Sequence, residues 1–393
     1  MDIKELLGFL KCEKVEFKEL GEITIQNAFK QLGASELERI KTNNGNIRLL
    51  PSSNNNNWYS NEELCKNYIC DGEIITLGRA RYANLKYHKG KFVSSNNIII
   101  QAKNDILCKY LYYFIATHTK KFYVETPTYP KFDNQIFQKT QIPVPPLEIQ
   151  QKIVEILDAF TELQAELQAE LHARRKQYEY YRNALLSFES LEKRAKAIGG
   201  LKLVSLGELF TIKNGYTPSK AKAEFWEGGT IPWFRMEDIQ TNRRILKDSI
   251  QHITPQAVKG KLFPANSIII STTATIGEHA LVIVDYLSNQ QFTCLIPQVN
   301  CCDRLNMRFM FYYGFILGEW CRNNVNKSAF PSVKMEQFKK VKIPLPPLEV
   351  QNDIVEILDA FDALANDLSA GLPAEIEARQ KQYEYYRERL LSF

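Results

Sequence analysis

The stretch IPVPPLEIQQKIVEILDAF, from Ile142 to Phe160, decides the fold because it returns 201 residues later as IPLPPLEVQNDIVEILDAF, from Ile343 to Phe361. The two copies agree at 15 of 19 positions. Each leads through a polar helical stretch into a second shared block, which reads KQYEYYRNALLSF at 176–188 and KQYEYYRERLLSF at 381–393. A helix duplicated in the middle and at the end of the chain predicts an internal tandem repeat of two similar units.

The helical stretches have coiled-coil spacing, with apolar residues separated by alternating steps of four and three. In LQAELQAEL, from Leu163 to Leu171, two steps of four occur in succession, and such a stutter locally unwinds a supercoil. The spacing predicts a spacer core made of Ile153, Ile156, Phe160, Leu163, Leu167, Ile354, Ile357, Phe361 and Leu364.

Prolines and glycines mark where these helices begin and break. Pro145-Pro146 and Pro346-Pro347 predict rigid corners before the two helices, because proline lacks the backbone N–H that would extend a helix backwards. Gly371-Leu372-Pro373 predicts a kink or break in the second helix. Two helices of about 40 residues, each roughly 60 Å long, are expected to pack antiparallel about a pseudo-two-fold axis. The alternative is that each helix packs only on its own domain.

The segments between the helices contain short strand-like runs, polar turns and one aromatic helix each. The sequence therefore predicts two α/β (α+β) domains separated by long helices. We expect one domain at 1–141, a central helix and linker at 142–199, a second domain at 200–342 and a C-terminal helix at 343–393.

Charge is segregated between these four parts. The two domain segments carry net charges of +5 and +7, whereas the two helical segments carry −1 and −6. Basic domains joined to non-basic helices favour a polyanion as the partner of the domains and a different partner for the helices.

Composition is that of an ordinary globular chain, with 45% hydrophobic and 24% charged residues. No apolar run reaches the length of a membrane span, and the first residues do not resemble a signal peptide. The eight cysteines form no C-x-x-C pair and no zinc-like spacing with the five histidines. We expect reduced thiols and a cytoplasmic location rather than disulfides or a metal site.

Common catalytic motifs are missing from the sequence. It contains no G-x-x-x-x-G-K-[ST] or G-x-G-x-x-G phosphate loop, no G-x-S-x-G and no H-E-x-x-H. The Pro-Pro pairs follow Val144 and Leu345, and no Asp or Asn precedes them that could hold a target amino group. We expect the chain to bind and position rather than to catalyse, with no catalytic residue and no metal.

Basic and polar loops are the candidates for contact with nucleic acid. Arg can read guanine, Asn and Gln can read adenine, and Lys, Ser and Thr can hold phosphates. Any one of these loops could also be a solvated turn, but the set occurs in both domains. The candidate DNA-binding residues are Lys41, Asn43, Asn44, Arg48, Arg79, Arg81 and Lys86 in the first domain, and Tyr216, Thr217, Ser219, Lys220, Arg235, Arg243, Arg244, Thr273, Thr275 and Lys327 in the second.

The duplicated IP-x-PPLE helix, QAELQAEL followed by ARRKQYEYYR, and the domain phrases IPWFRMEDIQ and IIISTTATIGEHALV resemble the specificity subunit of a Type I restriction–modification enzyme. The resemblance covers essentially the whole chain. It implies two target recognition domains that each read one half of a bipartite DNA site, with an antiparallel helical spacer that fixes the unread gap. Because the two domains differ in sequence, we expect the two half-sites to differ.

The resemblance also implies partners that carry the chemistry. These are two methyltransferase subunits that use S-adenosylmethionine to methylate adenine, and two motor-nuclease subunits that use ATP and Mg. We expect the chain itself to bind none of these cofactors. Tyr180, Arg182, Tyr385 and Arg387 in the YEYYR blocks are the candidate methyltransferase interface. The alternatives are a stand-alone methyltransferase or nuclease with fused recognition domains, and a coiled-coil scaffold without a role on DNA.

Overall fold

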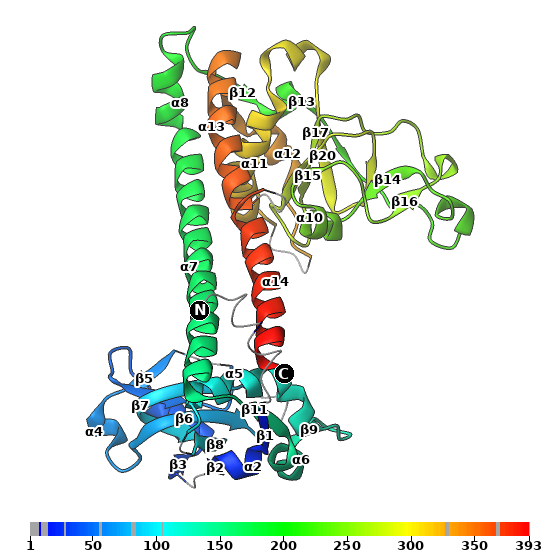
Figure 1. The fold of residues 1–393 in the computed structure, drawn as a ribbon. Helices are drawn as coiled ribbons and strands as arrows, with labels where there is room; N and C mark the ends of the chain where they lie inside the picture. The colour runs from blue at the N-terminus through cyan, green and yellow to red at the C-terminus, as the bar shows by residue number, and fades with distance from the viewer. Residues whose placement is uncertain are drawn as a thin grey trace. The chain divides into compact units, whose positions relative to one another are not determined.

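The computed structural model describes residues 8, 15–26, 29–54, 57–79, 84–103, 105–326, 330–366 and 370–392. The chain forms two compact units (Figure 1). Unit 1 is Met1–Ala169 together with Glu375–Phe393, and unit 2 is Glu170–Ala374. Both units therefore combine one domain with segments of helix from two different parts of the chain.

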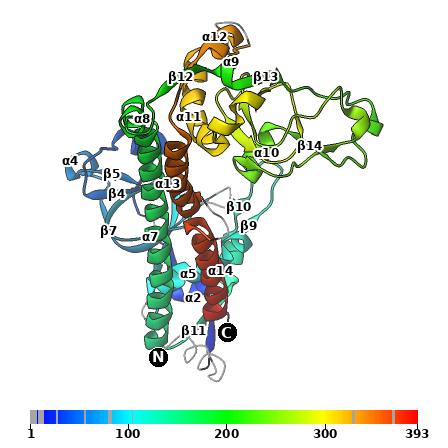
Figure 2. The same ribbon diagram turned by 90° about the horizontal axis from the view of Figure 1, so that it is seen from above.

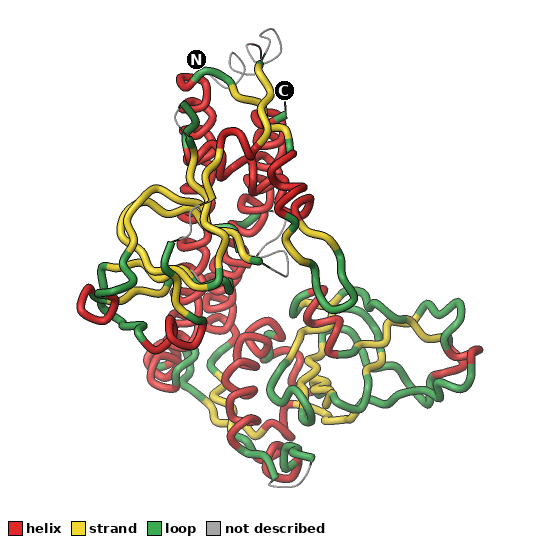
Figure 3. Tube along the Cα trace, turned by 90° about the horizontal axis from the view of Figure 1, so that it is seen from below, coloured by secondary structure: helices red, strands yellow, loops and turns green. Residues whose placement is uncertain are grey.

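The domain of unit 1 is built on a mixed sheet in the order β2-β8-β6-β7-β4-β5, with β3 paired to β7. Figure 3 shows these strands in yellow. The strands are β2 (Thr24–Gln26), β3 (Gln31–Leu32), β4 (Ile47–Leu50), β5 (Trp58–Ser60), β6 (Cys70–Gly78), β7 (Lys86–Ser95) and β8 (Asn97–Ala102), followed by the hairpin β9 (Tyr123–Val124) and β10 (Lys131–Phe132). The helices are α2 (Leu20–Ile23), α3 (Ala34–Arg39), α4 (Glu62–Cys65), α5 (Cys108–His118), η1 (Thr119–Phe122) and α6 (Asn134–Lys139).

Helix α5 joins this sheet to the helical spacer. Its residues Tyr110, Leu111 and Ile115 are fully buried in one core with Ile75 and Leu77 of β6. The predicted aromatic helix of the first domain is therefore present, and it is the layer between the sheet and the spacer.

The domain of unit 2 has a five-stranded sheet, β13-β20-β17-β18-β15, and a three-stranded sheet, β16-β14-β19. Its strands are β13 (Phe210–Asn214), β14 (Ile231–Phe234), β15 (Ile245–Leu246), β16 (His252–Ile253), β17 (Ser267–Ser271), β18 (His279–Val282), β19 (Leu287–Ser288) and β20 (Phe292–Pro297). The helices are α9 (Leu206–Leu209), η2 (Ala223–Phe225), α10 (Met236–Asn242), η3 (Pro255–Ala257), η4 (Val299–Arg304), α11 (Met307–Asn323) and α12 (Met335–Lys340). Here α11 is the aromatic helix between sheet and spacer.

Glycines let α11 approach the sheet closely. A Cβ on Gly318 would lie 2.3 Å from the carbonyl oxygen of Gly277, and a Cβ on Gly314 would lie 2.5 Å from the ring of His279. Gly277 itself has a φ of +91°, a conformation that glycine adopts at little cost. These contacts hold the loop between β17 and β18 against the helix.

Each domain is closed at its base by a two-stranded antiparallel sheet that we call the neck. In unit 1 the neck pairs β1 (Glu16–Glu19) with β11 (Gln141–Val144). In unit 2 it pairs β12 (Lys202–Ser205) with β21 (Lys342–Leu345). The strand that leaves each domain runs directly into the Pro-Pro corner, so both necks lie at the start of a spacer helix.

The spacer consists of α7 (Leu147–Leu185), a 39-residue helix, and of α13 (Leu348–Asn366) and α14 (Leu372–Leu391), which replace a second long helix. The break expected at Gly371-Leu372-Pro373 is confirmed, because α14 begins at Leu372. A short helix, α8 (Phe188–Ala195), follows α7.

Within each unit the spacer helices pack in opposite directions (Figures 1 and 2). In unit 1 the first half of α7 lies against α14, where Phe160 stacks on Tyr386 with ring centroids 5.7 Å apart. In unit 2 the second half of α7 lies against α13, where Tyr181 stacks on Phe361 at 5.2 Å. These two pairs are the same pair of positions in the two repeats. The expected antiparallel packing is therefore present, and separate packing of each helix on its own domain is excluded.

The predicted core of the spacer is wrong at two positions on α13. Ile357 and Leu364 are 37% and 43% exposed. Leu358, which the spacing did not select, is fully buried like the predicted Ile354, because α13 packs against α11 of the domain as well as against α7. Two buried residues per heptad are expected for a helix that packs against one neighbouring helix. A second neighbouring helix widens the buried face and rotates it around the helix.

Of the other expected core positions, Ile153 is fully buried and Leu167 is 8% exposed. Half-buried side chains occupy the remaining four: Ile156, Phe160, Leu163 and Phe361. Ile354 completes the set at 0% exposure.

Candidate nucleic-acid interface

A polar and aromatic hollow lies beside the β4–β5 hairpin of unit 1. It is lined by Lys41, Thr42, Asn43, Asn54, Asn57, Trp58 and Tyr59. Lys41 lies over the ring of Trp58 at 5.0 Å, and Arg48 lies over the ring of Tyr59 at 4.8 Å. Asn44 follows Asn43 in the chain and is exposed. The structure thus brings together Lys41, Asn43 and Arg48 of the predicted residues and adds two asparagines and two aromatic rings.

Lys86, a predicted DNA contact, is buried within its own domain. The side chain is 7% exposed, and its Nζ donates to the carbonyl oxygens of Pro51 and Ser53 at 2.7 and 2.8 Å. Burial, with Arg48 nearby, lowers the pKa of Lys86 to about 8. Asn84 also donates to the Ser52 carbonyl at 3.0 Å. Lys86 therefore anchors the loop that begins at Pro51.

Arg79 is exposed at the end of β6, where its backbone carbonyl accepts a hydrogen bond from Phe132. Asn84 and Lys86 tie the chain that follows it to the loop after β4, so Arg79 belongs to the same end of the domain as the hollow. Arg81 lies outside the described residues.

In unit 2 the loop after β13 meets the loop between β19 and β20. The Thr217 hydroxyl bonds to Gln290 Oε1, and the Tyr216 hydroxyl accepts a hydrogen bond of 2.6 Å from the backbone N–H of Lys259. The Lys259 ammonium group lies 5.8 Å from the centre of the Tyr216 ring. Ser219 and Lys220 are exposed in the same loop. Polar side chains from three loops therefore share one surface.

One more predicted residue, Arg235, adjoins this surface. Arg235 lies 5.6 Å from the Trp233 ring and pairs with Glu237 at 2.8 Å, while the Trp233 indole N–H donates to the Tyr216 carbonyl. Thr273 forms an isolated bridge with Ser332. Lys327 lies outside the described residues.

A separate cavity of about 760 Å³ lies where the second half of α7 faces the domain of unit 2. Four arginines line it, two from α7 and two from the loop after α10: Arg175, Arg182, Arg243 and Arg244. Thr275 is on its rim. The cavity joins three predicted DNA-binding residues to two helix residues, one of which, Arg175, the sequence reading missed.

The charges of this cavity are unequally compensated. Arg244 pairs with Glu278 at 2.5 Å and donates to the carbonyl of His279 at 3.0 Å. Arg182 lies 3.9 Å from the centre of the Phe315 ring, and burial lowers its pKa. Burial, followed by the repulsion of Arg244, also lowers the pKa of His279 to about 3. Four arginines and the carboxylates of Glu179, Glu278 and Asp362 line the cavity, so the lining carries a small excess of positive charge, which favours an anion.

The YEYYR blocks divide into exposed tyrosines and inward-facing arginines. Tyr180 is 69% and Tyr385 is 52% exposed, and these are equivalent positions of the two repeats. In contrast to the expectation of a partner interface, Arg182 packs on Phe315, and Arg387 lies over Tyr383 at 5.3 Å within unit 1. Both arginines make cation–π contacts within their own units, because an aromatic ring lies beside each guanidinium group.

Each junction between domain and spacer contains a fully buried glutamine with three hydrogen bonds. Gln150 accepts from the backbone N–H of Leu107 at 2.9 Å and donates to the carbonyls of Asp105 and Pro145 at 3.1 and 2.9 Å. Gln351 makes the same three bonds to Asn306, Arg304 and Pro346. We call these two sites the glutamine clamps.

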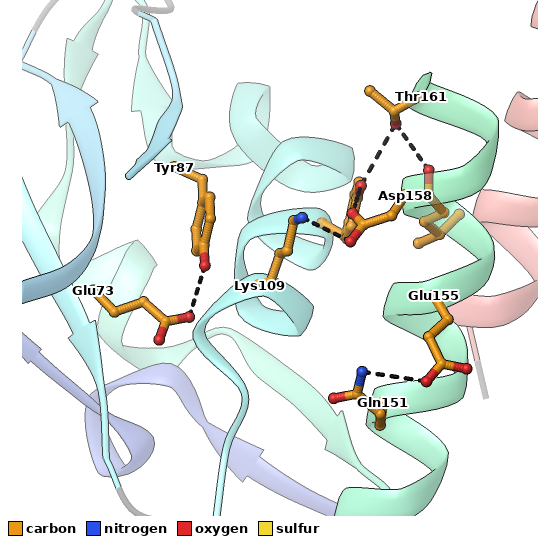
Figure 4. A network of polar contacts seen from close by, with 9 residues as sticks. Glu73, Tyr87, Lys109, Gln151, Glu155, Asp158 and Thr161 are labelled. Carbon is orange, nitrogen blue, oxygen red and sulfur yellow. Dashed lines mark hydrogen bonds and ion pairs between the residues drawn. The ribbon is translucent and has the colours of Figure 1, made fainter. Parts of the chain in front are cut away.

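A carboxylate two turns further along each helix makes a second attachment. Asp158 accepts from Lys109 Nζ at 2.6 Å and from the Tyr113 hydroxyl at 2.5 Å, both on α5 (Figure 4). Asp359 makes the equivalent bonds to Arg308 and Tyr312 on α11. The two domains, which share little sequence, are thus attached to the spacer by the same set of bonds.

The part of the chain that the structure describes contains no helix long and apolar enough to cross a membrane. Within those same residues, no group of three or more His, Cys, Asp or Glu side chains could hold a metal ion.

The family model of the Type I restriction modification DNA specificity domain matches this chain twice, at residues 11–174 and 199–378. The chain belongs to this family. Two specificity domains in tandem are the repeat that the duplicated helix predicts. Members of the family recognise DNA and are not the catalytic subunits of their complexes.

Curated relatives agree with this assignment. The specificity subunit of the Type I restriction enzyme EcoprrI from Escherichia coli is 55% identical over 48% of this chain and 49% of its own length, so the chain spans about half of that relative. The EcoR124I/EcoR124II specificity subunit, also from Escherichia coli, is 39% identical over 74% of this chain and 72% of that subunit.

Solved structures of Type I specificity subunits have a similar fold. The S subunit from M. genitalium has a TM-score of 0.58 at 14% identity and covers 97% of both chains. A chain from a study of complex assembly and conformational transition of the type I R-M system has a TM-score of 0.59 at 16% identity, over 97% of this chain and 99% of that one.

Several candidate residues of the specificity domains were missed from the sequence. Asn54 and Asn57 belong to SSNNNNW, an asparagine run of the kind that is typical of a turn. Gln290 stands in LSNQQFT, whose flanking residues are typical of a strand. Clusters of Asn and Gln beside an aromatic residue were the available indication, because amides are the side chains that read adenine.

Proposed function

We propose that this chain is the DNA-recognition subunit of a Type I restriction–modification complex, and that its two domains read two different half-sites of one asymmetric, bipartite sequence. The observation that supports this proposal is that the two junctions are built alike, whereas the loop surfaces differ. The two clamps make the same three bonds, and Asp158 and Asp359 each accept from one basic side chain and one tyrosine. The hollow of unit 1 presents Lys, Asn, Trp and Tyr, and the surface of unit 2 presents Tyr, Thr, Lys and Gln.

The candidate contacts with double-stranded DNA fall into two kinds. Asn43, Asn44 and Arg79 in unit 1, and Arg235 and Gln290 in unit 2, have the chemistry to read base edges. Lys41, Arg48, Tyr216, Thr217, Ser219, Lys220, Thr273 and the arginines of the cavity have the chemistry to hold phosphates. Arg81 and Lys327 stay predictions from the sequence.

The spacer is proposed to fix the number of unread base pairs between the half-sites. Helix α7 is continuous over 39 residues, so each residue added to it lengthens the helix as a whole. One added turn of four residues lengthens a helix by about 6 Å. That is nearly two base-pair rises, so we expect spacer length to set the gap.

Two methyltransferase subunits are the proposed partners of the spacer. Tyr180 and Tyr385 are exposed at equivalent positions of the two repeats, and an exposed tyrosine is a typical interface residue. Two equivalent exposed tyrosines are consistent with two copies of the same partner subunit. S-adenosylmethionine would be bound by those subunits, and ATP with Mg by two motor-nuclease subunits in the full complex. Such a complex works on DNA in the cytoplasm.

The test is to co-express the chain with its cognate methyltransferase subunit and to map methylated adenine across the genome by long-read sequencing. We expect one asymmetric motif of two half-sites with a fixed gap. Methylation by the chain without the partner would favour a fused enzyme, and no motif with the partner would favour a scaffold. Exchange of unit 2 loop residues Thr217 and Gln290 for alanine should alter one half-site and leave the other unchanged.

A further inference from the structure

The glutamine clamps hold the backbone of the recognition domain and the backbone of the spacer in one hydrogen-bonded unit. Gln150 joins two groups that precede α5, the Asp105 carbonyl and the Leu107 N–H, to the Pro145 carbonyl at the corner before α7. All three partners are backbone atoms, so the buried side chain of Gln150 ties the main chain before α5 to the main chain before α7. A change of its rotamer would break these bonds.

The rest of the junction restricts the remaining freedom. Pro145 and Pro146 stiffen the corner, and the neck holds the strand before it through Phe17 opposite Pro143. Two turns along the helix, Asp158 holds Lys109 and Tyr113 of α5 (Figure 4). The clamp and this carboxylate are two attachment points between the same pair of elements. Two separated points prevent a rotation that one point would allow.

The same construction stands in unit 2, where no shared domain sequence requires it. Gln351 bonds to Asn306, Arg304 and Pro346 at 2.8, 2.9 and 2.8 Å. The residues that supply the bonded backbone groups differ between the units, yet the bonds are the same. The feature common to the two divergent domains is therefore the way in which each is attached to its helix.

Geometry shows why that orientation matters for reading DNA. A domain of about 140 residues has a radius of gyration of about 14 Å, so its far loops lie roughly 25 Å from the junction. A tilt of about 10° at the junction moves those loops by about 4 Å. One base-pair step is about 3.4 Å. A small loss of angular precision is therefore enough to shift a half-site by one base pair.

We propose that Gln150 and Gln351 are positioning residues that determine the gap between the two half-sites, in addition to the length of the spacer. This rests on the proposed function. Gln150 sets the placement of the first half-site and Gln351 that of the second. The bases within each half-site are read by the loops and do not depend on the clamps.

The test uses the full chain with its methyltransferase subunits and measures the gap of every methylated site. The variants are Gln150→Leu, Gln351→Leu and the double variant, and the matched control is Gln151→Leu. Gln151 is the exposed neighbour on the same helix and bonds only weakly, at 3.4 Å, to Glu155 one turn away (Figure 4). We expect each clamp variant to keep both half-site sequences and to raise methylation of sites with gaps one base pair longer or shorter at least tenfold. The control should keep the single gap.

Stability and gap length are read separately. Thermal melting identifies a variant that has lost its fold. In that case Asp158→Asn and Asp359→Asn are used instead, because they weaken the second attachment and leave the buried apolar residues unchanged. The gap between half-sites is then measured in the same way. Folded variants with one unchanged gap overturn the proposal, as does a change in the half-site bases themselves. If the unaltered complex methylates no bipartite motif, the proposed function fails instead, before any variant is compared.

Discussion

Acid should destabilise unit 2 through a single buried histidine. His279 is 1% exposed on β18, and its Nε2 donates to the Phe311 carbonyl of α11 at 3.0 Å. Burial, then the positive charge of Arg244, lowers its pKa to about 3 in the folded chain. In the unfolded chain the pKa of histidine is about 6.5. Between these two values the unfolded state binds a proton that the folded state excludes.

The sign and size of the effect follow from this difference. The stabilisation is fully present above pH 6.5 and is lost as the pH falls below it, because protons then favour the unfolded chain. Between pH 7 and pH 5 the loss is about 2 kcal/mol in the free energy of unfolding. For a unit of about 200 residues this lowers the melting temperature by about 4–8 °C.

Tryptophan fluorescence during urea or thermal unfolding is the suitable assay. Three of the four tryptophans, Trp226, Trp233 and Trp320, are in unit 2, so the signal reports mainly on that unit. His279→Gln keeps an amide N–H for the Phe311 carbonyl but cannot take up a proton. We expect its stability to fall by about 2 kcal/mol less than that of the unaltered chain between pH 7 and pH 5. Equal pH dependence of the two proteins would refute the reasoning.

Three further predictions concern DNA binding and the spacer. Arg243→Gln and Arg175→Gln should each reduce the slope of the log of the DNA-binding constant against log salt concentration by about 1, and should weaken binding to all DNA sequences alike. Fluorescence anisotropy with the methyltransferase complex measures both. An unchanged slope would show that the cavity holds no phosphate. Lys86→Met should leave the methylated motif unchanged while lowering the melting temperature of unit 1 by several degrees, about 1–3 kcal/mol for two unsatisfied carbonyls, and a changed motif would restore Lys86 as a DNA contact. Insertion of one further LQAE into Leu163–Leu171 should lengthen the gap by one or two base pairs, and an unaltered motif would contradict this.

The helical part of the fold could be predicted from the sequence because its pattern is local. Apolar steps of four and three describe a helix against a helix, and Gly371 with Pro373 marks the break. The same pattern misplaced Ile357 and Leu364, because spacing along one helix does not show that α11 lies on its other side.

Individual loop residues could be predicted only in part, because their environment depends on distant segments. Lys86 stands in a basic, polar stretch typical of a nucleic-acid contact, yet the carbonyls of Pro51 and Ser53 surround its ammonium group. The glutamine clamps were also missed, although Gln150 and Gln351 are identical in both copies of the repeat. Each glutamine stands one turn after a Pro-Pro corner and beside apolar positions, and it is present in both copies of the repeat. This combination indicates a buried side chain whose polar atoms are hydrogen-bonded.

The two necks have a consequence for the way new specificities can arise. The register that pairs Phe17 with Pro143 also pairs Leu203 with Pro344, so both domains leave and rejoin the rest of the chain through adjacent strands of the same geometry. A genetic crossover within the repeated coding sequence for IP-x-PPLE could therefore replace one domain and leave every bond of the other unit in place. A single recombination event would give the host a new target sequence with the same gap, and no further mutations would be needed for the hybrid chain to fold.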